Sequence, residues 1–307
     1  MRIASIDIGT NTILLLIAEV DENGVIHPLE HRQQIPRIGK DVDKNKIINS
    51  AAFARTAQIL NDYKKIAFEY KVDSIIACAT SAVRDADNRN QLLAYLNEAT
   101  GIKVEVLSGE EEAYISFTGV LSGYNELVSS ACVIDVGGGS TEVSYLKDEQ
   151  IVMNSFRIGA VRLKERHFRH NRTTVHEISE AKSAINQAID KDVRSGVNAR
   201  TIIGVGGTAT TLACIDQGLK EFEVSKVNGY CLTIDKIENW FNKLIMMPVA
   251  EIFSLSNATH GREDILAAGV LILSEFMKKS DIDNMIVSER GLRYGLVLRE
   301  WKHRMKF

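Results

Sequence analysis

The first third of the chain alternates short apolar runs with polar turns. Apolar residues dominate, or alternate with polar ones, at positions 2–7, 12–20 and 25–33. A turn at Gly9 and the polar segment 21–24 separate these runs. Side chains on a strand point alternately to the two faces of a sheet, and Gly, Asn and Asp favour tight turns. The pattern therefore predicts three strands joined as a meander.

Helical and strand patterns alternate after this meander. Apolar side chains recur at helical spacing across residues 50–70. The segments that follow predict a strand at 74–79, a helix at 88–99, a strand at 103–107 and a helix at 110–121. The first half of the chain is therefore interpreted as a strand-rich start followed by alternating strands and helices, which is typical of an α/β fold with a sheet of mixed direction.

The second half repeats this order. Its apolar segments predict strands at 131–136, 141–146 and 150–156, a helix at 174–193 and a strand at 201–204. Ile202 lies 67 residues after Asp135, much as Ile75 lies 68 residues after Asp7. The segment 285–289 echoes 106–110 after about fifty extra residues, which include predicted helices at 234–246 and 263–279. We interpret the chain as two copies of one plan.

This duplication predicts two domains. At 307 residues the chain is longer than chains that usually fold around one hydrophobic core. We expect an N-terminal α/β domain over 1–122 and a C-terminal α/β domain over 123–307, with a helical insertion at about 214–280. A C-terminal helix at about 296–307 is expected to pack back on the first domain. Ligands of such folds bind where the carboxyl ends of strands meet, so we expect the active site in an inter-domain cleft.

Two glycine-rich turns occupy matched positions in the two copies. The first contains Asp7, Gly9, Thr10, Asn11 and Thr12, and the second contains Asp135, Gly137, Gly138, Gly139, Ser140 and Thr141. In each turn, a carboxylate at the end of a strand is followed by backbone N–H groups and hydroxyls. Such groups hold phosphate oxygens and a hard metal ion. A hairpin turn would explain one copy, but repetition in the duplicated plan favours phosphate binding.

Two further segments are candidate anion sites. Thr80 and Ser81 follow the strand at 74–79 and lead to Arg84, whose guanidinium suits bidentate contact with phosphate. Gly207 and Thr208 follow the strand at 201–204 in the second copy. A helix N-cap with a surface Arg explains the first segment equally well, and a cap explains the second.

Carboxylates near these turns are candidates for catalysis. Glu110, Glu111 and Glu112 open the helix at 110–121, where acids also stabilise the positive end of the helix dipole. Successive helix positions point about 100° apart, so only one of the three can face a given site. Glu142 follows the second glycine turn and lies within reach of a metal ion or water there.

Composition limits the partners of the chain. Its net charge of −3 does not attract polyanions, so local groups must bind any anionic ligand, and we expect no nucleic-acid partner. No apolar run has the length of a membrane span, which predicts no membrane partner and a cytoplasmic location. Trp301 and Phe307 near the C-terminus hint at the contacts of a homodimer.

The most basic stretch of the chain runs from 157 to 172. Four of its arginines are candidates for a track that guides a long polyanion: Arg157, Arg162, Arg166 and Arg169. On a helix, three of these four would share one face. A solvated helix face without a ligand is the alternative.

The motifs together resemble the exopolyphosphatase and guanosine pentaphosphate phosphohydrolase (Ppx/GppA) family, within the superfamily of sugar kinases, heat-shock ATPases and actin. The matching segments, in chain order, are 7–12, 79–86, 108–113, 135–142, 157–163 and 206–208. The resemblance covers nearly the whole chain and is greatest to the short, two-domain type. It implies two ribonuclease H-like (actin-like ATPase) domains related by internal duplication.

The resemblance also implies an activity: hydrolysis of a terminal phosphate from inorganic polyphosphate or from guanosine pentaphosphate. Glu112 matches the family residue that activates water, and Asp135 and Glu142 match further catalytic positions. Mg²⁺ would be held by Asp135, with Asp7 or Glu142, although other divalent cations are possible. Two alternatives remain open, namely a kinase or ATPase of the same superfamily and a non-catalytic regulator that binds polyphosphate or an alarmone.

Overall fold

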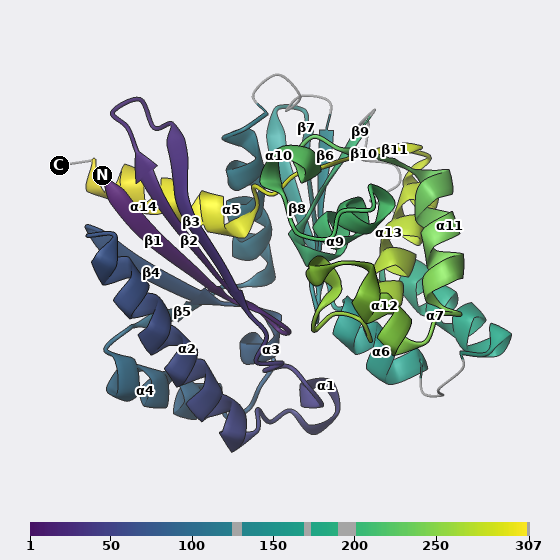
Figure 1. Cartoon of the computed structure of the whole chain (residues 1–307), viewed down its shortest axis with the longest axis horizontal. Helices are drawn as coiled ribbons and strands as arrows, with labels where there is room; N and C mark the ends of the chain where they lie inside the picture. The colour runs from purple at the N-terminus through teal and green to yellow at the C-terminus, as the bar shows by residue number, and fades with distance from the viewer. Residues whose placement is uncertain (125–130, 169–172, 190–200, 306–307) are drawn as a thin grey trace. The chain divides into compact units, whose positions relative to one another are not determined.

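The computed structural model describes residues 1–124, 131–168, 173–189 and 201–305. The chain divides into two compact units (Figure 1). Unit 1 comprises Met1–Asn125 together with Arg290–Phe307, and unit 2 comprises Glu126–Glu289. The chain thus crosses from one unit to the other twice, and its last 18 residues return to the unit in which it began.

A five-stranded mixed sheet forms the centre of the described part of unit 1, in the order β3-β2-β1-β4-β5. Its strands are β1 (Arg2–Ile8), β2 (Ile13–Val20), β3 (Ile26–Gln34), β4 (Ser74–Ala79) and β5 (Val104–Val106). Strands β1 to β3 form the predicted antiparallel meander, and β4 pairs with β1 in parallel. The carboxyl ends of β1 and β4 therefore lie side by side, at the turn that follows Asp7.

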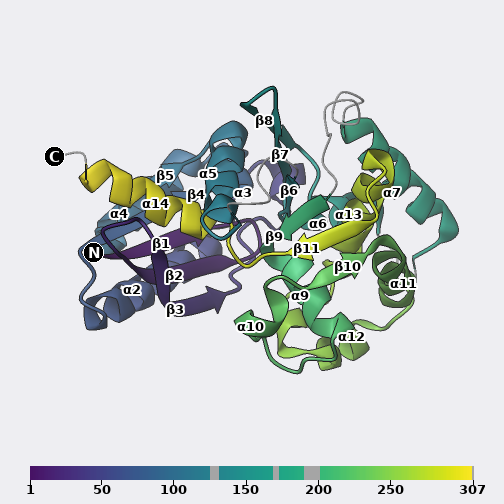
Figure 2. The same ribbon diagram turned by 90° about the horizontal axis from the view of Figure 1, so that it is seen from above.

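Helices cover both faces of this sheet (Figures 1 and 2). The helices of unit 1 are α1 (Val42–Asn45), α2 (Ser50–Glu69), α3 (Ser81–Arg84), α4 (Arg89–Thr100), α5 (Gly109–Leu121) and α14 (Leu292–Arg304). Side chains of α2 and α4 form one core with Ile6, Ile8 and their neighbours. On the opposite face, α5 and α14 pack against Ile3, Leu16 and Cys78. The alternation along β1 divides its side chains between these two cores.

Unit 2 is built on a six-stranded sheet, counted over its described residues, in the order β10-β11-β9-β6-β7-β8. The strands are β6 (Ala131–Val136), β7 (Thr141–Lys147), β8 (Gln150–Phe156), β9 (Thr201–Val205), β10 (Cys231–Thr233) and β11 (Asn284–Val287). Strands β6 to β8 repeat the meander, and β9 and β11 take the places of β4 and β5. The two sheets share one strand order apart from the extra edge strand β10, which confirms the predicted α/β fold of two related halves.

The helices of unit 2 surround this sheet and supply most of its core (Figure 2). They are α6 (Ala160–His167), α7 (Val175–Ala188), α9 (Gly206–Asp216), α10 (Val224–Val227), α11 (Ile234–Leu244), α12 (Val249–Leu255) and α13 (Leu266–Ser280), with a short 3₁₀ helix at Asn257–Thr259. Helix α9 is buried along most of its length against β6, β9 and β11. The helix begins with Gly206, Gly207 and Thr208, so this candidate anion-binding segment lies next to the core of unit 2.

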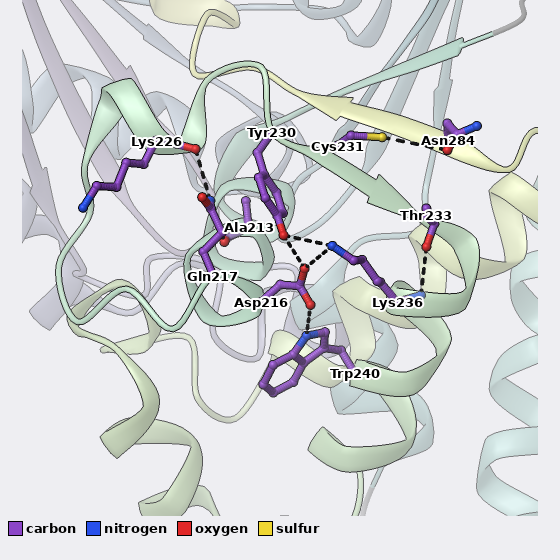
Figure 3. A network of polar contacts seen from close by, with 10 residues as sticks. All are labelled: Ala213, Asp216, Gln217, Lys226, Tyr230, Cys231, Thr233, Lys236, Trp240 and Asn284. Atoms are coloured by element: carbon purple, nitrogen blue, oxygen red, sulfur yellow. Dashed lines mark hydrogen bonds and ion pairs between the residues drawn. The ribbon is translucent and has the colours of Figure 1, made fainter.

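A polar network fixes the other end of α9 (Figure 3). The carboxylate of Asp216 accepts hydrogen bonds from the Tyr230 hydroxyl at 2.7 Å and the Trp240 indole at 2.8 Å. It also pairs with Lys236 Nζ at 2.9 Å. Burial of this carboxylate raises its pKa, but the three donors outweigh burial and lower the pKa of Asp216. A carboxylate at a helix C-terminus opposes the helix dipole, and the Lys236 ammonium offsets that cost.

Trp301 does not lie on an open face of unit 1. Its indole ring packs with Val20, Ile26 and other core residues, and a Cβ on Gly24 would come within 3.0 Å of it. Phe307 lies outside the described residues. The expected homodimer therefore stays a prediction, and the packing of Trp301 within unit 1 does not support it. In the described part of the chain, no helix is both long and apolar enough to cross a bilayer.

Candidate active site

The first glycine turn presents its backbone in an ordered way at the end of β1. The N–H of Gly9 donates to the carbonyl of Thr12 at 2.9 Å and closes the turn. The carbonyl of Thr10 accepts from the N–H of Gly39 at 2.8 Å, and that of Asn11 accepts from the N–H of Arg37 at 3.1 Å. The carbonyls of Thr10 and Asn11 are thereby bound by the segment after β3.

The turn after β4 is tied to the first glycine turn. The hydroxyls of Thr10 and Ser81 lie 2.9 Å apart and share a hydrogen bond, and both side chains are buried. Helix α3 begins at Ser81 and ends at Arg84, so the same short helix brings this guanidinium to the carboxyl edge of the sheet. Two of the predicted anion-binding segments of the first copy are therefore adjacent in unit 1.

Arg84 and Glu112 form an ion pair in unit 1. Arg84 Nη1 lies 2.9 Å from Glu112 Oε2, and the side chains are only 21% and 12% exposed. The same nitrogen donates to the Leu107 carbonyl at 2.8 Å. Burial raises the pKa of the nearby Cys78 thiol, and the negative charges of Asp7 and Glu112 raise it further. Glu112, Asp7 and Arg84 thus gather at the carboxyl edge of one sheet.

The neighbouring glutamates of the same helix turn have other positions. Glu111 forms a capping box with Ser108: its side chain accepts from the Ser108 N–H at 2.8 Å, and the Ser108 hydroxyl accepts from the Glu111 N–H at 3.1 Å. These hydrogen bonds to Ser108 lower the pKa of Glu111. Glu110 is exposed. Among the three candidates, Glu112 is therefore the one that faces Arg84.

The second glycine turn repeats the geometry of the first. The N–H of Gly137 donates to the carbonyl of Ser140 at 3.0 Å, as Gly9 does to Thr12. The carbonyl of Gly137 accepts from the Ala160 N–H at 2.9 Å, and the carbonyl of Gly138 accepts from the Val161 N–H at 2.8 Å. The carbonyls of this turn are therefore bound by the N-terminus of α6, the segment after β8.

Arg162 completes the support of this turn. It is only 5% exposed, and its Nε donates to the Gly139 carbonyl at 2.7 Å. The predicted polyanion track placed Arg162 on one helix face together with Arg166 and Arg169. The burial of Arg162 and its hydrogen bond to Gly139 argue against a place in the track, which stays a prediction. Arg157 and Arg166 are exposed and stay candidates for the track, while Arg169 lies outside the described residues.

The second glycine turn also has backbone donors that the described fold does not use. Within the described parts of the chain, the backbone N–H groups of Gly138, Gly139 and Ser140 donate no hydrogen bond. A Cβ on Gly159 would lie 2.6 Å from the backbone of Gly138, so α6 approaches the turn as closely as a glycine permits. The carbonyls of these three residues accept hydrogen bonds from other groups of the fold. Their three consecutive N–H groups therefore form a nest suited to an anion.

Two carboxylates stand beside this nest. Asp135 on β6 and Glu142 on β7 are direct partners across the antiparallel pair, so their side chains emerge on the same face of the sheet. Glu142 is 3% exposed, and its Oε1 accepts from the Ser155 hydroxyl at 2.7 Å. Thr141 is also buried, and its hydroxyl donates to the Ile158 carbonyl at 2.6 Å. The Thr141 hydroxyl therefore binds the protein backbone and stabilises the turn. The sequence alone did not distinguish this role from contact with a ligand.

Gly206 and Gly207 lie close to charged groups of unit 2. A Cβ on Gly206 would lie 2.2 Å from Asp135 Oδ1, and a Cβ on Gly207 would lie 1.8 Å from Arg262 Nη1. Thr208 Oγ1 donates to the Val136 carbonyl at 3.3 Å. Asp135 and Arg262 therefore lie against the same turn. Arg262 is partly buried, and burial lowers its pKa to about 10.

Sequence reasoning missed Arg262 and the segment around Arg37. Arg262 follows a short irregular segment in the insertion, and no periodicity marked it. The second omission had a visible signal: Arg37-Ile38-Gly39 repeats Arg157-Ile158-Gly159, and each triplet follows the third strand of its meander. In both copies this triplet, or the residues directly after it, binds the carbonyls of the glycine turn.

The residues of unit 2 fit a magnesium ion. Within the described residues, no cluster of three or more His, Cys, Asp or Glu side chains is arranged to bind a metal ion. Mg²⁺ at phosphate-transfer sites is, however, commonly held by one or two carboxylates, with phosphate and water completing its coordination. Asp135 and Glu142 on one face, next to a nest for phosphate, provide such a donor set.

Comparisons with known proteins find relatives that match nearly the whole chain. A sequence model described as the Ppx/GppA phosphatase family matches residues 16–304. Exopolyphosphatase 2 of Mycobacterium tuberculosis is 30% identical over 97% of this chain and 98% of its own length. A guanosine-5'-triphosphate,3'-diphosphate pyrophosphatase of Vibrio cholerae is 24% identical over 96% of this chain and 58% of its own length. The crystal structure of the Aquifex aeolicus member of the Ppx/GppA family superposes with a TM-score of 0.82 at 31% identity, covering 99% of this chain and 98% of that one.

Proposed function

The chain belongs to the Ppx/GppA phosphatase family, and on that premise we propose that it is an exopolyphosphatase, which releases orthophosphate from the end of inorganic polyphosphate. The observation that carries the proposal is the nest formed by the N–H groups of Gly138, Gly139 and Ser140. Its donors, with the carboxylates of Asp135 and Glu142 beside it, suit a phosphate that brings a cation with it. The relative from Mycobacterium tuberculosis, named as an exopolyphosphatase, supports polyphosphate as the substrate.

In the proposed reaction, the nest of the second glycine turn binds the terminal phosphate. The oxygen of a water molecule bonds to the terminal phosphorus while the bond from that phosphorus to the bridging oxygen breaks. Glu112 accepts a proton from the water, and the products are orthophosphate and a chain shorter by one phosphate. A positioned general base contributes a factor of about 10² to 10⁴ to such a rate.

Charge stabilisation supplies much of the remaining catalysis in phosphoryl transfer. The N–H groups of the nest and the guanidinium of Arg84 would contact phosphate oxygens, with Gly207 and the nearby Arg262 as further anion-binding candidates. Mg²⁺, when bound, offsets phosphate charge, and Asp135 and Glu142 would hold it, with Asp7 as the third predicted ligand. The buried hydroxyls of Thr10, Ser81 and Thr208 are engaged in hydrogen bonds that order these turns.

A second candidate function is hydrolysis of the 5'-terminal phosphate of guanosine pentaphosphate. The relative from Vibrio cholerae, named for a guanosine substrate, favours it. The same nest, base and cation would serve both substrates, since the reacting group is a terminal phosphate in each. The two functions differ in the recognition of a guanosine.

One assay separates these functions. The purified chain is incubated with Mg²⁺ and, separately, with long polyphosphate, guanosine pentaphosphate, and ATP with and without acceptors, and released phosphate is measured. We expect the highest kcat/KM with polyphosphate. Release from guanosine pentaphosphate alone would favour the second function, and binding of polyphosphate without any release would identify a regulator.

The Glu112→Gln variant tests the assigned base. We expect its kcat to fall by about 10² to 10⁴ while KM changes little, because Gln keeps the shape of the side chain but cannot accept a proton. Glu110→Gln is the matched control, since it makes the same chemical change in the same helix turn at an exposed position. Wild-type turnover of Glu112→Gln would remove Glu112 from this role.

A further inference from the structure

The guanidinium of Arg84 has two kinds of nitrogen, distinguished by their partners. Nη1 donates to both the Leu107 carbonyl at 2.8 Å and Glu112 Oε2 at 2.9 Å. Nε and Nη2 form no hydrogen bond with any residue that the structure describes. The side chain keeps 21% of its surface exposed, so part of it can be reached from solvent.

Two anchors fix the position of this guanidinium. Helix α3 is attached to the first glycine turn through the hydrogen bond between Thr10 and Ser81, and Arg84 is its last residue. The Leu107 carbonyl belongs to the segment that leads into α5, whose first turn carries Glu112. Arg84 therefore joins the element that holds the phosphate-binding turn to the element that holds the predicted base.

We propose that Arg84 is a positioning residue that sets the location of the Glu112 carboxylate relative to the terminal phosphate. This inference rests on the proposed function. Nη1 holds Glu112, and Nε and Nη2 bind a phosphate oxygen, so one planar group spans base and substrate. A guanidinium has five N–H donors in a rigid fork and can form both sets of contacts at once, whereas an ammonium is a single point charge.

Positioning is needed here because of charge. Asp7 on β1, the Glu110 and Glu111 carboxylates of α5 itself, and an incoming polyphosphate all repel the Glu112 carboxylate. Arg299 on α14 is another cation in this neighbourhood, since it acts on both Cys78 and Glu111, but its guanidinium is paired with Glu105. The guanidinium of Arg84 offsets part of this repulsion at Glu112.

A double-mutant cycle tests this inference. If Arg84 acts through Glu112, Arg84→Gln lowers kcat by 10-fold or more in the wild-type background. In the Glu112→Gln background it lowers kcat by less than about 3-fold, because the effects of mutating two residues that act as a unit are not additive. Equal factors in the two backgrounds, or a change confined to KM, would show that Arg84 only clamps phosphate and would overturn the inference.

Two further variants keep the cycle interpretable. Arg84→Lys retains the charge without the fork, so we expect a KM near that of the wild type and a kcat that stays 10-fold or more reduced; a restored kcat would overturn the inference. Arg299→Gln is the matched control, because it breaks a surface Arg–Glu pair of the same unit, and we expect unchanged kinetics. Wild-type turnover of Glu112→Gln would instead refute the proposed base, whereas a slow Glu112→Gln with an additive cycle would refute the positioning role alone.

Discussion

The contact between Gly206 and Asp135 offers a test of whether turnover depends on the position of the Asp135 carboxylate. Gly206 has a φ of +76°, a conformation that side chains rarely adopt, and a Cβ there would lie 2.2 Å from Asp135 Oδ1. Contacts of a Cβ shorter than 3.0 Å are essentially never seen, so in Gly206→Ala the carboxylate must move until this separation rises from 2.2 Å to 3.0 Å or more. The carboxylate is the end of a flexible side chain and can move, but it then leaves its place beside the nest.

We expect two separable effects in Gly206→Ala. The left-handed backbone costs about 1 kcal/mol of folding free energy when Ala replaces Gly. Displacement of a catalytic group by about 1 Å costs roughly 10²-fold in rate. Gly229→Ala is the matched control, because its φ is +83° and a Cβ there meets no atom within 4 Å.

The assay combines urea unfolding with phosphate release. Both variants should lose a similar free energy of unfolding, while only Gly206→Ala should lose about 10²-fold in kcat. Full activity of Gly206→Ala would show that the position of Asp135 does not matter for turnover. Equal losses of activity in the two variants would attribute the effect to backbone strain.

Three further predictions concern metal, pH and the basic stretch. Removal of divalent cations with EDTA should abolish phosphate release and added Mg²⁺ should restore it, with a weaker apparent Mg²⁺ affinity in Asp135→Asn; release that is insensitive to EDTA would contradict the predicted cation. The folded state lowers the pKa of Asp216, so its stabilising effect should be complete above the unfolded-state pKa of about 4 and disappear as the pH falls through the folded value. Urea unfolding should therefore show the advantage of the wild type over Asp216→Asn as constant between pH 5 and 7 and shrinking below about pH 4, and an advantage that does not change with pH would refute the network. Replacing Arg157 or Arg166 by Gln should raise KM more for long polyphosphate than for short chains, and equal effects at all lengths would argue against a track.

Much of the fold could be predicted from the sequence because its signals are local. The turns at Gly9 and Gly137 divide apolar runs of strand length, and their repetition in the chain predicts two sheets with one strand order. Helix α2 shows a clear apolar face over 20 residues. Helix α9 shows no such periodicity, since it is buried on nearly all sides, and β10 is only three residues long. Tertiary packing rather than local pattern decides those elements.

The sequence predicted which segments form the candidate site, but it predicted the contacts of single side chains less well. Ser108-x-x-Glu111 is a capping-box pattern that could have assigned Glu111 to the helix N-terminus and left Glu112 as the base candidate. The burial of Arg162 could not be predicted, because a helical face alone does not show which side packs against the glycine turn. The pairing of Arg84 with Glu112 joins residues 28 positions apart and depends on the approach of α3 to α5.

A crystal structure of the Glu112→Gln variant with Mg²⁺ and inorganic tripolyphosphate would locate the terminal phosphate. We predict oxygens of the terminal phosphate at hydrogen-bond distance, about 2.7–3.2 Å, from the N–H groups of Gly138, Gly139 and Ser140, with the side chain of residue 112 directed at the same phosphorus. A phosphate bound away from this nest, or a residue 112 that stays remote from the phosphorus, would contradict it.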